Sequence, residues 1–333
     1  PFAYVGSRIG VAEGAGINIG CAAAGALLGN SVAEGVALLY MWLTTRRRRP
    51  SFRQLPQDEA LEPYTRNGLL KRLLSLAIPI TLGACIVPLA SFIDSGMLVN
   101  RLVDSAGFAT AEARAMYGRF SGYVITLINV PTAIAIAIAM SLVPAISSAM
   151  ARQDKPAIRR QSAQGVRFAF LMGLPCSVGM SLLSKPILSM IYHFPSEAAL
   201  QMTADLLSMS SLTIVLFTVV QATSGILQGL RKQRIPMYTL AAGVVVKIVL
   251  NYTLVGTPSI HIYGAPIASI ACYTISMLPN LYYVHKYADY PVQWMSGLLR
   301  PLAATAGMGL VIWAGRMLLP MRWWSTVLLI AVG

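Results

Sequence analysis

Long apolar runs separated by short polar gaps dominate this chain of 333 residues. A helix that crosses the ~30 Å hydrocarbon core of a bilayer needs ~20 mostly apolar residues, and it satisfies its own backbone hydrogen bonds there. Eight runs approach that length, which predicts an all-α, polytopic membrane helical bundle. The expected spans are 20–43, 74–99, 122–146, 168–191, 206–227, 238–255, 265–284 and 298–319.

Neither end of the sequence has the pattern expected of a natural terminus. The first residue is Pro1 rather than Met, and residues 1–10 resemble the end of an earlier helix. A ninth apolar run begins near Trp323 and stops at Gly333, short of the length of a span. We therefore expect the sequence to be a fragment of a longer protein.

Composition and charge agree with a membrane location. The chain is 56% hydrophobic and 11% charged, whereas soluble domains are about 45–50% apolar and about 25% charged. The net charge of +14 would suggest nucleic acid as a partner in a soluble protein. Here the basic residues lie in the gaps between apolar runs, which is the positive-inside pattern, so no nucleic-acid partner is predicted.

The distribution of Lys and Arg predicts an orientation. Alternate gaps at 44–73, 147–167, 228–237 and 285–297 hold most of the 26 basic residues, which places Arg46–Arg49 in the cytoplasm. The gap 44–73 is also polar and rich in proline, which favours a linker between two helical bundles. Its basic run either binds anionic lipid headgroups or serves only as a topology signal.

Sequence signatures of enzymes and metal sites are missing. There is no GxSxG motif or P-loop, and the three histidines lie at or beyond the ends of the expected helices without partners at metal-ligand spacing. The four cysteines stand alone in apolar stretches, as packing residues do. We expect no catalytic residue, no metal and no cofactor.

Ionisable residues at membrane depth are the strongest candidates for function, because each costs at least ~2.5–3.5 kcal/mol near a helix centre. Asp94 and Lys247 are such residues, and Asn251 shares a helix face with Lys247 at i+4. Lys247 and Asn251 suit an anionic headgroup, or Lys247 forms a buried pair with a carboxylate that holds helices together. Asn129 and Gln228 line a cavity or bond across helices. These five residues are the candidate substrate-binding set.

Prolines recur within the expected spans, where each removes a backbone donor and tends to kink its helix. Broken helices are typical of transporters, so this frequency favours a moving, cavity-lined bundle. The residues are Pro79, Pro88, Pro131, Pro144, Pro175 and Pro186.

Several short stretches resemble one family. They are Asn129–Thr132 with Ser141–Ser147, then Lys185–Ile187 with Met190–Tyr192, Ile226–Pro236 and Lys247–Tyr252. In this order and spacing they resemble the polysaccharide biosynthesis proteins of the stage V sporulation protein B type. That group belongs to the multidrug/oligosaccharidyl-lipid/polysaccharide exporter superfamily and is related to the lipid II flippases.

The resemblance implies a fold of two six-helix lobes around a central cavity, followed by two further helices. Residues 1–43 then form the end of the first lobe, and 44–72 form a cytoplasmic linker between the lobes. Residues 73–287 form the second six-helix lobe, and 288–333 are additional C-terminal helices, the last one cut short. Most of the first lobe, with its cavity cations, is absent from the sequence.

The resemblance also implies a function without catalysis. The expected activity is that of a flippase or exporter for an undecaprenyl-linked saccharide, either lipid II or a polysaccharide precursor, in the bacterial plasma membrane. The expected partners are that lipid, membrane lipids and a possible coupling cation. Lys247 and Asn251 would contact the anionic headgroup, and Asp94 would pair with a cation or take part in ion coupling. A cation-coupled multidrug exporter and a non-transporting scaffold of a wall-synthesis or sporulation complex remain alternatives.

Overall fold

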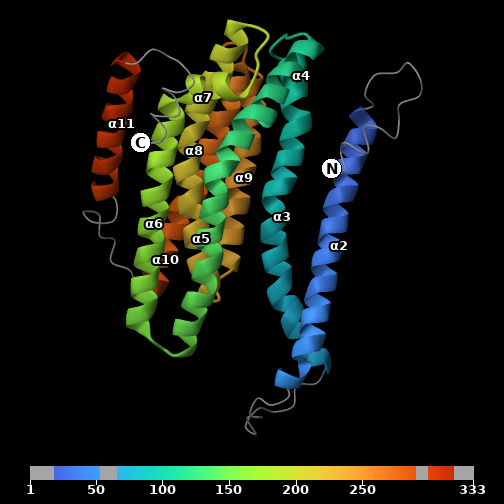
Figure 1. Ribbon diagram of the computed structural model, residues 1–333, viewed down its shortest axis with the longest axis vertical. Helices are drawn as coiled ribbons and strands as arrows, with labels where there is room; N and C mark the ends of the chain where they lie inside the picture. Colours follow the sequence, from blue (N-terminus) through green and yellow to red (C-terminus); the bar gives the residue numbers. More distant parts are fainter. Residues whose placement is uncertain (1–18, 53–65, 290–298, 319–333) are drawn as a thin grey trace. The chain divides into compact units, whose positions relative to one another are not determined.

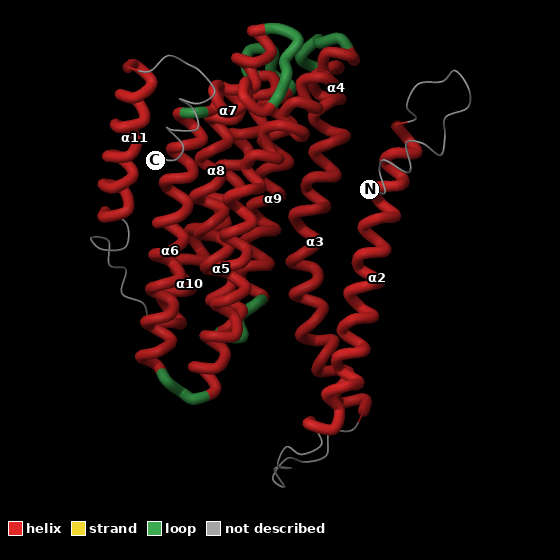
Figure 2. Tube along the Cα trace, viewed as in Figure 1, coloured by secondary structure: helices red, strands yellow, loops and turns green. Residues whose placement is uncertain are grey.

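The computed structural model describes residues 19–52, 66–289 and 299–318, and the regular structure in this part of the chain is entirely helical (Figures 1 and 2). This confirms the predicted all-α class. The elements are α2 (Ile19–Phe52), α3 (Arg66–Asp104), α4 (Thr110–Arg119), η1 (Phe120–Ile125), α5 (Thr126–Ala151), α6 (Lys155–Leu182), α7 (Ser184–Ile191), α8 (Glu197–Gly229), α9 (Arg234–Val255), η2 (His261–Tyr263), α10 (Gly264–Ala288) and α11 (Arg300–Leu318).

The chain divides into two compact units, residues 1–68 and 69–333. In the first unit α2 exposes large apolar side chains, and the guanidinium of Arg46 lies 4.1 Å from the ring centroid of Trp42. A tryptophan beside a cation is typical of a helix at the membrane–water interface. α2 and α3 both extend into the region 44–72 that was predicted as linker, because Arg and Lys are good helix formers.

Six helical segments of the described chain are long and apolar enough to cross a membrane. They overlap six of the predicted spans, and α2 and α11 lie where the other two were predicted. The ninth run near Trp323 and residues 1–10 lie outside the described residues. The six segments are Thr81–Asp104, Thr110–Ala151, Lys155–Leu182, Glu197–Gly229, Arg234–Val255 and His261–Ala288.

The predicted span 168–191 is wrong as a single helix, because the chain breaks at Leu183 between α6 and α7. Leu183 adopts φ −101° and ψ 14°, and Pro186 has no N–H to continue the ladder of α6. The span predicted at 122–146 is longer than expected. It begins at Thr110 and passes through the π-helical turn η1 before it reaches α5.

Helix α8 is the centre of the second unit and packs against α5, α6 and α10. It is apolar around its whole circumference, as a buried helix is expected to be. Its threonines keep their hydroxyls satisfied inside the helix, since Thr218 and Thr223 donate to the carbonyls of Ile214 and Val219. Close approach depends on small residues such as Gly225, where an added Cβ would lie 2.6 Å from the carbonyl oxygen of Ala139 on α5.

The helical order places the α7–α8 loop and the α8–α9 loop at opposite ends of α8 (Figure 2). In the full-length protein without its native cysteines, we expect His193→Cys to react with a membrane-impermeant maleimide on intact cells. We expect Lys232→Cys to react only after the membrane is permeabilised, because the basic loop stays in the cytoplasm. The opposite labelling pattern would overturn the predicted orientation of the chain.

Candidate functional site

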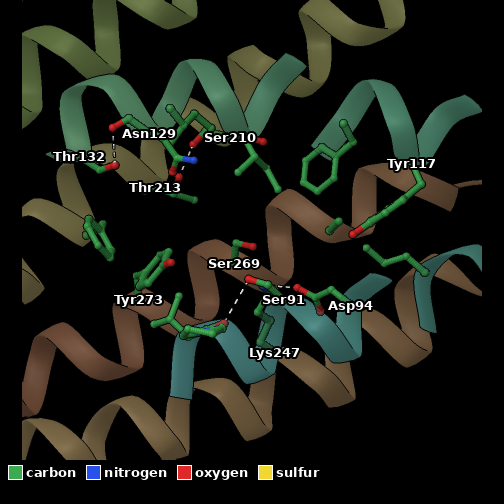
Figure 3. A pocket seen from close by; sticks show the side chains of 18 of the residues that line it. Ser91, Asp94, Tyr117, Asn129, Thr132, Ser210, Thr213, Lys247, Ser269 and Tyr273 are labelled. Atoms are coloured by element: carbon green, nitrogen blue, oxygen red, sulfur yellow. Dashed lines mark hydrogen bonds and ion pairs between the residues drawn. The ribbon is translucent and has the colours of Figure 1, made fainter. Parts of the chain in front are cut away.

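The carboxylate of Asp94 on α3 holds two side chains of α9. The Lys247 ammonium donates to Asp94 Oδ2 at 2.5 Å (Figure 3). Asn251 Nδ2 donates to Asp94 Oδ1 at 2.8 Å. The side chains of Asp94 and Lys247 are only 12% and 17% exposed, and Asn251 is fully buried. The structure therefore joins three of the five candidate residues in one charge-neutral group.

The sequence of α9 accounts for this arrangement. Lys247 and Asn251 are one helical turn apart, so both side chains reach the same neighbour. On the same helix, Gly243 lets the backbone of α10 come close, because a Cβ there would lie 2.5 Å from the carbonyl oxygen of Cys272. Small residues at such positions bring helices into contact in membranes. Helix α9 therefore packs against α10 and turns its two polar side chains toward α3.

A cavity of about 430 Å³ adjoins the Asp94–Lys247 pair (Figure 3). Both residues line it, together with side chains from α3, α4, α5, α8 and α10. The further polar lining residues bear hydroxyl or amide groups and no charge. They are Ser91, Tyr117, Asn129, Thr132, Ser210, Thr213, Ser269 and Tyr273.

The hydroxyl of Ser210 is buried in the wall of this cavity and has no partner among the described residues. Ser210 is 3% exposed, and its Oγ is buried without a hydrogen bond. The hydroxyl of Thr213, by contrast, donates to the carbonyl of Ser210 at 2.6 Å. A buried polar group that lacks a partner costs free energy, so this wall offers a hydrogen bond to a polar molecule that enters the cavity.

The helix that passes the cavity is irregular. The π turn η1 supplies Phe120 and Ile125 to the lining, and Pro131 follows within the next two turns. π turns occur mostly as local insertions within α-helices, frequently at functional sites. Pro131 removes the backbone donor that would reach the carbonyl of Leu127. This stretch of α5 therefore lacks part of the hydrogen bonding that makes a helix rigid.

The candidate residues do not all meet in one place. Asn129 lines the cavity, and Asn251 reaches it through Asp94. Gln228 lies in a separate hollow between α5 and α8, which Gln221 also lines. Sequence analysis missed the serine, threonine and tyrosine residues of the cavity. Serine and threonine hydroxyls usually bond within their own helix, and nothing in the sequence marks the serine, threonine or tyrosine residues that line a cavity.

The group of Asp94, Lys247 and Asn251, with the hydroxyl and amide groups of the cavity, is suited to binding polar molecules. Within residues 19–52, 66–289 and 299–318, no three His, Cys, Asp or Glu side chains come together as a metal site would require. The Asp94 carboxylate already has a partner on each oxygen. The arrangement therefore offers hydroxyl and amide groups for hydrogen bonding, and one ammonium whose charge is balanced.

Comparison with known families identifies the wider group to which the chain belongs. Residues 15–332 match the family model described as lipid II flippase MurJ. The chain belongs to the lipid II flippase MurJ family. This confirms the resemblance inferred from the short motifs, and it makes the chain a multi-pass protein of the bacterial plasma membrane.

Curated relatives from Bacillus subtilis (strain 168) show the same relationship. Lipid II flippase MurJ is 26% identical over 274 residues, which are 82% of this chain and 49% of the relative. Uncharacterized membrane protein YabM is 27% identical over 291 residues, 86% of this chain and 51% of the relative. Stage V sporulation protein B is 26% identical over 251 residues, which are 75% of this chain and 46% of the relative. The chain thus spans about half the length of the curated relatives it matches.

The burial of the Asp94–Lys247 pair predicts that replacing only one of the two residues destabilises the fold. We expect Lys247→Met to lower the free energy of unfolding by about 3–5 kcal/mol, because it leaves a buried carboxylate without its cation. The matched control is Lys185→Met, which breaks the exposed Lys185–Glu197 pair (2.6 Å, with side chains 36% and 73% exposed) and should cost about 0–1 kcal/mol. Thermal unfolding in detergent measures both variants. Equal losses would contradict the assignment of Asp94–Lys247 as the stabilising pair.

Proposed function

We propose that the full-length protein moves a lipid-linked saccharide, either lipid II or a related undecaprenyl-linked polysaccharide precursor, across the plasma membrane. The observation that carries the proposal is the family match over residues 15–332, supported by the relative that is itself a lipid II flippase. The reaction is a translocation, so it needs no catalytic residue, metal or cofactor.

We assign the parts of the chain as the sequence predicted. Residues 1–43 are the end of the first lobe, 44–72 the linker, 73–287 the second six-helix lobe and 288–333 additional helices. In support of this, the boundary between the compact units at residues 68 and 69 falls inside the assigned linker. The six helical segments able to cross a membrane lie between residues 81 and 288.

The cavity beside Asp94 supports the proposal on physical grounds. A saccharide headgroup loses hydrogen bonds to water when it enters the membrane, and each unmade bond of a buried polar group costs about 1–3 kcal/mol. Hydroxyl and amide groups such as those of Ser210 and Asn129 replace part of that hydration. Prolines and the π turn in the same helix suit a wall that moves between two states.

In this proposal Lys247 contacts the substrate only when its ion pair with Asp94 opens. Its ammonium is held by Asp94, so an anionic headgroup must compete with that carboxylate for it. A contact made only in one state of the transporter shifts the population of states, which is what transport by alternating access requires. A coupling cation at Asp94 would likewise need Lys247 to move, because both carboxylate oxygens are engaged.

A charge-neutral double variant separates a transport role from a purely structural one. Asp94→Asn with Lys247→Met removes both charges, and it keeps an amide oxygen that can accept from Asn251. We expect its unfolding temperature to recover relative to either single variant, because no buried charge remains unpaired. We expect lipid flipping to stay reduced by roughly tenfold or more, since a hydrogen bond to a charged group is lost.

The assay is flipping of a lipid-linked saccharide by the full-length protein in proteoliposomes. The control is the exposed pair neutralised in the same way, Glu197→Gln with Lys185→Met, which should flip normally. If the Asp94/Lys247 double variant also flips at the normal rate, the pair is only a clamp between α3 and α9.

A further inference from the structure

Helix α11 packs against α6 on a part of the second unit that does not contribute to the Asp94–Lys247 site (Figure 1). The C-terminal half of α11 packs tightly against α6. Ile312 is 2% exposed, and a Cβ on Gly309 would lie 3.3 Å from Val178 Cγ1. Arg316 donates a hydrogen bond to the carbonyl of Leu182, one of the carbonyls left free where α6 ends. The two helices are therefore in direct contact over this half.

Toward the start of α11 the contact opens into a cavity of about 370 Å³. Leu171, Pro175 and Met308 form its apolar walls, and Arg167 and Arg300 stand at its edge on the two helices. None of the described residues that line the cavity bears a carboxylate. Among the described residues, neither arginine makes an ion pair or a hydrogen bond, so the cavity presents two guanidinium groups without a counter-charge.

A third polar residue lines this space, and its hydroxyl has no partner among the described residues. Thr305 lines the cavity, is 3% exposed, and its Oγ1 is buried with no hydrogen bond among the described residues. In a membrane helix a threonine hydroxyl commonly donates to a carbonyl of its own helix, as Thr218 does. The Thr305 hydroxyl makes no such bond, so it remains available to a ligand.

The depth of the two arginines in the membrane indicates which class of ligand would suit the cavity. Arg167 directly precedes the apolar stretch of α6, and Arg300 is the first residue of α11. Both therefore lie at one boundary of the hydrocarbon core, the cytoplasmic one in the predicted orientation. Lipid phosphates occupy that level, and a planar guanidinium matches phosphate oxygens with two parallel donors. Basic pockets between membrane helices on the cytoplasmic side are typical sites for anionic lipids.

We propose that this cavity binds an anionic glycerophospholipid such as phosphatidylglycerol. The phosphate lies between the guanidinium groups of Arg167 and Arg300, and the Thr305 hydroxyl donates to a phosphate or ester oxygen. One acyl chain covers the apolar walls at Leu171 and Met308. The lipid thereby fills the half of the α6–α11 interface that side chains leave open. This inference concerns a lipid that is not transported, and it does not depend on the proposed function.

The test measures lipid retention by the purified full-length protein with native mass spectrometry, during titration with phosphatidylglycerol or zwitterionic phosphatidylcholine. We expect phosphatidylglycerol to be retained preferentially. Arg167→Gln and Arg300→Gln should each weaken its binding by roughly tenfold, since each loses a charge-assisted hydrogen bond. Arg167→Lys keeps the charge but loses the planar guanidinium that donates two parallel hydrogen bonds. Its affinity for phosphatidylglycerol should therefore lie between those of the wild type and Arg167→Gln.

The control is Arg234→Gln, which removes an exposed cation from the predicted cytoplasmic end of α9 and should leave binding unchanged. Thr305→Val preserves the shape of the side chain, so it tests the hydroxyl even if an arginine variant fails to fold; we expect weaker binding. The proposal is overturned if both phospholipids are retained equally or if the arginine variants bind normally. It is also overturned if undecaprenyl phosphate, added as a competitor, is the lipid that Arg167 and Arg300 select instead.

Discussion

The rest of the second unit is arranged around the need to keep the charges of Asp94 and Lys247 together. At membrane depth an unpaired ion of either sign costs several kcal/mol, so α3 and α9 must face each other at these two residues. Asn251 satisfies the remaining carboxylate oxygen, and Gly243 sets α9 against α10 one turn from the pair. The cavity lies beside the Asp94–Lys247 ion pair.

Many buried polar groups of the bundle are paired within or between helices, but some of those in the described chain are not. The threonines of α8 donate to carbonyls of their own helix, and Thr239 donates to Asn280 across α9 and α10 at 2.8 Å. The hydroxyls of Ser210 and Thr305 are as deeply buried and have no partner in the described chain. Each of these two residues lines a cavity that also holds at least one cation. Other buried groups of the described chain, such as the Ser162 hydroxyl and the Asn280 amide nitrogen, also lack partners but lie outside these cavities, so the cations rather than the missing hydrogen bonds distinguish the two sites.

Hydropathy alone predicted the helical class and most of the spans, because the bilayer fixes the length of an apolar run. It also singled out Asp94 and Lys247, since charges are rare at such depth. Sequence could not show that these two residues meet, because they are 153 positions apart and their pairing depends on how α3 packs against α9. The sequence also could not predict the position of the π turn η1. It could not show that Asn129 lines the cavity beside Asp94 whereas Gln228 lines a different hollow. A helix pattern does not encode which of two polar faces borders the cavity.

Charge balance gives the proposed transport a physical consequence. The headgroup of a lipid-linked pyrophosphate is anionic, whereas Asp94 and Lys247 together are neutral. If the headgroup takes Lys247 from Asp94, the carboxylate is left at membrane depth without a counter-charge. A bare carboxylate there is as unfavourable as a bare ammonium, so Asp94 must then acquire a proton or another cation. Entry of the anion and uptake of a positive charge are thus linked through one pair of side chains. If transport proceeds as proposed, ion coupling would follow from the electrostatics of this pair.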